Sequence, residues 1–189
     1  MRTIGFSIRL SASSNSWVLV LLMLSAGAAP YQSPAKPDSP KVVIEKLMKM
    51  TDDGSLLTAD GWKQAGVLFL HPTPQPQHPT LRVIWKNYAV SLSSTNGDRA
   101  VVYVGYTDLG QIDSRLHYIP FDPTIAKSAA IFHMVLANGQ WKIEDPQDWP
   151  WASLDAAMRH VKEMRRKAVD PTIQKNADAT LDILAKFRG

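Results

Sequence analysis

The apolar positions that follow residue 40 have the spacing of one face of a helix; they are Val42, Ile44, Leu47 and Met50. Asp38 or Ser39 can cap this helix, with Pro40 in its first turn. A second helix is predicted from Thr58, whose hydroxyl can cap it, through Phe69. Residues 71–80 contain four prolines and are predicted to form a stiff loop.

The period of the apolar positions changes after residue 80. Residues 81–93 and 99–107 are rich in β-branched and aromatic residues, and Asn96-Gly97 between them is a strong hairpin signal. With this dipeptide as a two-residue turn, Leu92 is predicted to pair with Val101. Neither face of the hairpin is plainly polar, so we expect both faces to be covered.

A second hairpin is predicted from residues 129–137 and 140–145, which flank Asn138-Gly139. Residues 109–127 show no period and are predicted to be irregular, with a short strand at 115–118.

Two further helices are predicted at the end of the chain. One apolar stripe consists of Leu154, Met158, Val161 and Met164. Asp170-Pro171 is a cap followed by a first-turn proline. The stripe after it consists of Ile173, Ala177, Leu181, Leu184 and Phe187. The whole pattern predicts an α+β fold, in which N-terminal helices pack on a curved antiparallel sheet and a C-terminal helix pair is added.

The first 28 residues have the three parts of a cleavable signal peptide. Arg2 and Arg9 supply the positive segment, residues 17–24 are an unbroken apolar run, and Ala26-Gly27-Ala28 fits a cleavage site. The apolar run is far shorter than a membrane span requires. The sequence therefore predicts an exported protein, periplasmic or secreted, that is cut after Ala28 and has no membrane span in its mature form.

Composition narrows the classes of function. The chain contains no cysteine, which excludes disulfides and thiol catalysis. Loss of Arg2 and Arg9 with the signal peptide lowers the formal net charge from +4 to +2. This near balance does not indicate a nucleic-acid partner. Residues 29–40 are rich in proline and serine and are predicted to be a linker before the folded domain.

Residues 41–148 resemble the nuclear-transport-factor-2-like superfamily, whose fold is a cystatin-like α+β cone. The resemblance consists of two helices, a proline-rich loop and an antiparallel meander that closes on the sequence NGQWKIED at residues 138–145. It implies that the N-terminal helices pack across a curved sheet, and in relatives the outer face of this sheet often serves as a dimer interface. Residues 149–189 are an addition to the pattern and can cover that outer face.

Enzymes of this superfamily place an Asp, or an Asp–His pair, inside the cone, where burial raises carboxylate pKa values. The predicted hairpin pairing puts Asp145 on the core face with Phe132, and His133 opposite Glu144 on the other face. Asp145 and His133 are therefore the candidate acid–base residues. We favour a plainer interpretation, in which Asp145 ends its strand and His133 forms a solvated cross-strand pair.

Four aromatic residues can line an apolar ligand pocket, although aromatic residues on helices and strands more often form the core. They are Trp62, Tyr88, Tyr103 and Trp141, with Trp85 close by. His71 and His78 flank the proline-rich loop without a third ligand nearby, so no metal and no other cofactor is predicted. Asp52-Asp53-Gly54 has the pattern of a turn at a helix end rather than of a calcium loop.

The basic run Arg165-Arg166-Lys167 lies near the end of its predicted helix, where cations interact favourably with the helix dipole. We interpret it as a solvated face, with binding to an anionic membrane or to a partner as the alternative.

Three hypotheses for function follow. The first is a non-catalytic binding or interaction module, with an apolar small molecule, a second copy or an envelope protein as its partner. The second is a cofactor-free isomerase, dehydratase or hydrolase that uses Asp145 or His133. The third is an accessory protein of a cell-envelope assembly, docked through the C-terminal helices.

No nucleophile elbow, phosphate-binding loop or zinc-protease motif is present in the sequence.

Overall fold

The structure is a computed structural model that describes residues 38–75, 80–84, 87–121, 127–146 and 151–188. The predicted signal peptide, almost all of the predicted linker, His78 and Trp85 lie outside the described residues. All described elements belong to one compact unit, Lys36–Gly189.

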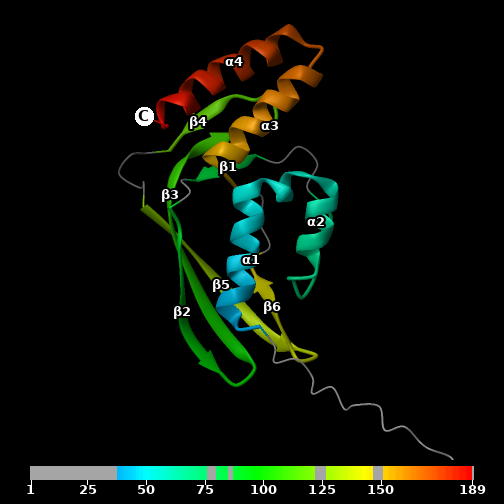
Figure 1. The fold of residues 1–189 in the computed structure, drawn as a ribbon, viewed down its shortest axis with the longest axis vertical. Helices are drawn as coiled ribbons and strands as arrows, with labels where there is room; N and C mark the ends of the chain where they lie inside the picture. The colour runs from blue at the N-terminus through cyan, green and yellow to red at the C-terminus, as the bar shows by residue number, and fades with distance from the viewer. Residues whose placement is uncertain (1–37, 76–79, 85–86, 122–126, 147–150, 189) are drawn as a thin grey trace, which may run out of the picture. The chain divides into compact units, whose positions relative to one another are not determined.

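The described residues form an α+β fold whose helices lie near the two ends of the sequence (Figure 1). The helices are α1 (Pro40–Asp53), the short 3₁₀ helix η1 (Ser55–Leu57), α2 (Ala59–Gly66), α3 (Leu154–Lys167) and α4 (Pro171–Lys186). The strands are β1 (Leu81–Ile84), β2 (Ala89–Asn96), β3 (Arg99–Ile112), β4 (Tyr118–Pro120), β5 (Lys127–Ala137), β6 (Gln140–Asp145) and β7 (Trp151–Ser153).

The helix starts follow local capping chemistry and confirm the predicted starts, although α2 ends at Gly66 rather than continuing through Phe69 as predicted. The side chain of Ser39 accepts a hydrogen bond from the Val42 N–H at the start of α1. Thr58 does the same for α2, and Asp170 for α4. Gly54 ends α1 in the left-handed conformation, at φ 76°, which glycine adopts without strain.

The long strand β3 joins two parts of the sheet. Its residues Arg99–Thr107 pair with β5 along one edge. Along the opposite edge, the residues from Arg99 to Gly105 pair with β2. The remainder of β3 pairs with β1 and β4. Strand β1 also pairs with β7, in parallel, so the sheet is mixed rather than wholly antiparallel as predicted. Strand β7 is too short to give an apolar period and was not predicted.

Two predictions about the strands are wrong. The strand predicted over 81–93 is divided into β1 and β2, and β3 continues through residues predicted to be irregular. The predicted strand 115–118 is replaced by a turn before β4. There the Asp113 carboxylate accepts hydrogen bonds from the backbone N–H groups of Arg115 and His117, which holds the turn closed.

The register of the β2–β3 hairpin also differs from the prediction. Asn96 pairs with Arg99, so the turn residues are Gly97 and Asp98 rather than Asn96 and Gly97. A bulge between Leu92 and Ser94 then shifts the pairing by one residue, and Leu92 pairs with Val102 instead of Val101.

The β5–β6 hairpin follows the predicted register as far as Met134 and Ile143, which pair as expected. Beyond them a bulge at Glu144 shifts the ladder, and His133 pairs with Asp145. The predicted pairs Phe132–Asp145 and His133–Glu144 are therefore wrong. The bulge moves Asp145 from the core face to the opposite face of the sheet.

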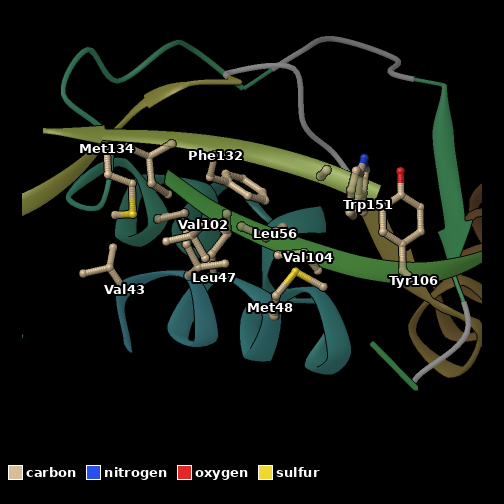
Figure 2. Close-up of a cluster of buried hydrophobic side chains, with 14 of the residues drawn as sticks. Val43, Leu47, Met48, Leu56, Val102, Val104, Tyr106, Phe132, Met134 and Trp151 are labelled. Carbon is tan, nitrogen blue, oxygen red and sulfur yellow. The ribbon is translucent and has the colours of Figure 1, made fainter. Parts of the chain in front are cut away.

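Helices α1 and α2 lie on one face of β2, β3, β5 and β6 (Figure 1). Figure 2 shows Phe132 of β5 and Val102 of β3 facing Leu47 of α1 across this layer. We call this the first core. Its fully buried members are Ile44, Leu47, Met48, Ile84, Val102, Val104, Phe132, Met134 and Ile143.

The C-terminal helices cover a second core at the other end of β3. It consists of Leu81, Val83, Ile112, Leu116, Ala152, Leu154, Ala156, Ala157, Met158, Val161, Ala177 and Leu184. Helices α3 and α4 thus pack on β1, β7 and the end of β3. On the opposite face from the first core, Tyr103 is 37% exposed and Ile131 is 43% exposed. Within a single chain, therefore, the described residues cover only one of the two faces of this hairpin.

Candidate functional site

The two candidate acid–base residues lie outside the cone. His133 and Asp145 are cross-strand partners, and both are exposed on the face away from α1 and α2. Glu144, the expected partner of His133, forms an ion pair with Arg99 of β3 instead. The structure therefore brings His133 and Asp145 together on an open surface rather than in an enclosed interior.

The four candidate pocket aromatics do not meet in one cavity. Trp62, Tyr88 and Trp141 are half-buried and pack around the first core. The indole N–H of Trp62 donates to the Thr73 carbonyl oxygen at 2.8 Å. Tyr103 lies on the opposite face of the sheet. The predicted four-residue pocket is therefore not formed.

The space beneath α2 is nearly filled by side chains. Between Leu47, Leu56, Trp62 and Phe69 a cavity of about 10 Å³ remains, which is room for one water molecule. Outside α2, Trp62, Lys63 and Pro72 line a shallow groove of about 480 Å³ that is open to solvent. The space beneath α2 therefore does not hold a small-molecule ligand, and the nearby groove does not enclose one.

Tyr88 has the clearest electrostatic perturbation of the described residues. Burial raises the pKa of its phenol to about 12, and the negative charge of Asp52 and a hydrogen bond to it add to the shift. A free tyrosine ionises near pH 10. Since the folded pKa lies above the unfolded one, this contribution to stability is present below pH 10 and is lost as the pH rises to about 12.

We expect the alkaline absorbance titration of the wild type to contain one phenolate step near pH 12 that is missing from Tyr88→Phe. The difference between the two titrations isolates this residue. Asp52→Asn should move the step to lower pH, although burial should keep it above the ordinary value. If the difference between the two titrations showed its step at the pKa of a free tyrosine, the assignment of the high-pH step to Tyr88 would be wrong.

A partly buried polar cluster lies between the two cores and was not predicted. Ser128 Oγ donates to Oδ2 of the nearly buried Asp108 at 2.8 Å. Arg82 Nε lies 3.8 Å from Asp108 Oδ1, and Arg82 Nη1 donates to the Tyr106 hydroxyl at 3.1 Å. Burial, followed by the charge of Asp108, raises the pKa of the Tyr106 phenol.

Aromatic rings complete this cluster. The guanidinium carbon of Arg82 lies 5.8 Å from the centre of the Trp151 ring and 5.4 Å from that of Phe121. Tyr106 packs on Trp151, with ring centres 4.3 Å apart. The cluster joins β1, β3, β5 and β7, and its opposite charges offset each other.

The face of the sheet turned away from α1 and α2 is the candidate interaction surface, which we call the outer face. Its central residues on β3 and β5 are Val101, Tyr103, Ala129, Ile131, His133 and Val135. The adjacent β2 contributes the small residues Ala89, Ser91 and Ser94. Charged residues lie toward its margin, where Arg99 pairs with Glu144. An apolar centre with a polar margin is typical of protein–protein interfaces.

Comparisons with protein-family models, with curated proteins and with solved structures give no match. Among the described residues, no group of three potential metal-ligating side chains gathers at one point. Across the same ranges, no helix is both long enough and apolar enough to cross a bilayer.

Proposed function

We propose that this chain is an exported, non-catalytic interaction module that associates with a second copy of itself through the outer face. The exposure of Tyr103 and Ile131 at the centre of that face carries the proposal. The export component rests on the sequence pattern of residues 1–28, which lie outside the described residues.

The packing of the interior supports a non-catalytic function. Phe132 and Met134, together with the apolar face of α1, fill the layer in which an enzyme of this architecture would hold its substrate. Asp145 and His133, the residues with the chemistry for proton transfer, lie on the outer face. In that position Asp145, on the edge strand β6, fits the polar margin of an interface, and His133 lies beside the apolar centre.

The shape of the outer face supports a second copy as the occupant. Tyr103 and Ile131 are direct cross-strand neighbours. The flanking positions on β2 are alanine and serine, so a second sheet can approach to the usual spacing of about 10 Å. A surface with an apolar centre is self-complementary under twofold symmetry, because each apolar centre covers the other.

The resemblance to the nuclear-transport-factor-2-like superfamily is in keeping with this proposal. The resemblance rests on the sequence pattern over residues 41–148, and relatives often pair through the outer face of the sheet. Helices α3 and α4, which could have covered this face, pack on the second core instead.

The proposal predicts that Ile131→Asp, made in the chain that begins at Ala29, converts a dimer into a folded monomer. A carboxylate at the centre of the interface would lose its hydration without a partner, which weakens association by a thousandfold or more, about 4 kcal/mol. Native mass spectrometry and circular dichroism check mass and fold together.

The matched control is Ile119→Asp on β4. Ile119 is 46% exposed, much like Ile131, but lies away from the outer face. This variant should remain a dimer. If the two variants give the same mass distribution, the outer face is not the interface and the proposal fails.

A further inference from the structure

The end of α3 and the turn that follows it form a second surface, separate from the outer face. Helices α3 and α4 lie side by side as a hairpin (Figure 1). The last residue of α3 that is buried in the second core is Val161, and residues 162–167 are all exposed. We call residues 162–175 the hairpin tip.

Basic side chains dominate the hairpin tip. It contains five of them, Lys162, Arg165, Arg166, Lys167 and Lys175, against the two acidic residues Glu163 and Asp170. Two of the cations are neutralised locally. Lys167 Nζ lies 2.6 Å from Glu163 Oε1, and Arg165 forms two hydrogen bonds with Asp178 on α4, at 2.5 and 3.0 Å.

Lys162 and Arg166 lie on adjacent turns of the same side of α3, four residues apart. Within the described ranges, neither forms an ion pair. Asp170, the remaining acidic residue of the tip, accepts a hydrogen bond from the Thr172 N–H as the cap of α4. Lys162 and Arg166, together with Lys175, are the three cations of the hairpin tip that form no ion pair within the described ranges.

Apolar side chains accompany these cations. Val169 is 94% exposed, the highest exposure of any large apolar side chain among the described residues, and Met164 is 37% exposed. Val169 follows Arg166 by three residues, at the turn between the helices. A projecting valine beside unpaired cations suits an interface that is anionic at its surface and apolar just beneath it.

We infer that the hairpin tip docks the protein on the surface of a bilayer that contains anionic phospholipid. Lys162 and Arg166 interact with the headgroup phosphates, and Val169 enters the boundary between headgroups and acyl chains. The helices remain outside the hydrocarbon layer. This inference does not depend on pairing through the outer face, because the two surfaces share no residue.

The test measures co-flotation of the chain that begins at Ala29 with vesicles. This chain keeps the whole compact unit and lacks the apolar run 17–24, which would bind lipid by itself. One set of vesicles is phosphatidylcholine alone, and in the other about a third of the lipid is phosphatidylglycerol. Binding is expected to the second set only and should weaken with added salt.

The double variant Lys162→Gln, Arg166→Gln should bind the anionic vesicles about 25-fold more weakly, at about fivefold for each cation. Its matched control is Lys41→Gln, Lys49→Gln, which removes the same charge from exposed positions of α1 and should bind within about twofold of the wild type. Val169→Ser should lose about fivefold, and Val67→Ser, another exposed valine, should lose nothing.

Three results would overturn the inference. They are equal binding to both sets of vesicles, no binding to either set, and equal losses in the α3 and α1 double variants. The last result would mean that net charge rather than this surface determines binding.

Discussion

Replacing Phe132 with alanine should lower the free energy of unfolding by about 3 to 5 kcal/mol. Phe132 has no exposed surface and lies at the centre of the first core, between α1 and the sheet (Figure 2). Its neighbours Val102 and Met134 are held in the ladder of β3 and β5, so the backbone cannot close the cavity. Urea denaturation followed by circular dichroism measures the loss.

Ile119→Ala is the comparison for this prediction, since Ile119 lies on β4 with nearly half of its surface exposed. It should cost less than about 1 kcal/mol. A loss for Phe132→Ala no greater than that of this control would show that the first core is loosely packed and leaves room for a ligand.

Gly61→Ala should lower the free energy of unfolding by about 3 kcal/mol, at the upper end of the usual cost of overpacking. A β-carbon at Gly61 would lie 2.0 Å from the Ser55 carbonyl oxygen and 2.5 Å from its carbon. Both are backbone atoms of η1, so no side-chain rotation relieves the clash. Either η1 or the start of α2 must move.

Gly66→Ala provides the matched control on the same helix. A β-carbon there would meet the Pro72 side chain at 3.4 Å, an ordinary contact. Alanine also favours helix over glycine, so this variant should be neutral or more stable by up to about 1 kcal/mol. If both substitutions changed the free energy of unfolding by the same amount in urea denaturation, α2 would not approach η1 as closely as the structure shows.

The helices were predictable because their signals are local. Ser39, Thr58 and Asp170 each cap a helix within three residues of their own position. The apolar stripes that follow these caps give the buried faces directly. Nothing outside each segment is needed to identify these elements.

Strand register was less predictable, because one inserted residue reverses the faces of every residue beyond it. The bulge at Glu144 left the pairing of Met134 with Ile143 as predicted, but it moved Asp145 to the outer face. A bulge near Ser93 did the same in the first hairpin. Neither bulge has a glycine or proline that would mark it in the sequence.

The polar cluster and the outer face depend on contacts between distant parts of the chain. Arg82 and Asp108 meet only because β1 pairs with the last third of β3. A charged residue in the interior of each strand was the available signal, but it does not identify the partner. The exposure of Tyr103 likewise depends on α3 and α4 packing elsewhere, which their stripes do not specify.

Burial of the outer face in a pair of identical chains is the central claim. The absence of cysteine allows a direct measurement, because a single introduced thiol can be followed without background. In the chain that begins at Ala29, Ser91→Cys places a thiol on the outer face beside Tyr103, and Ser114→Cys places one in the exposed turn before β4. With rising protein concentration, the rate of maleimide labelling should fall at position 91 and stay constant at position 114. Rates that are independent of concentration at both positions would contradict the claim.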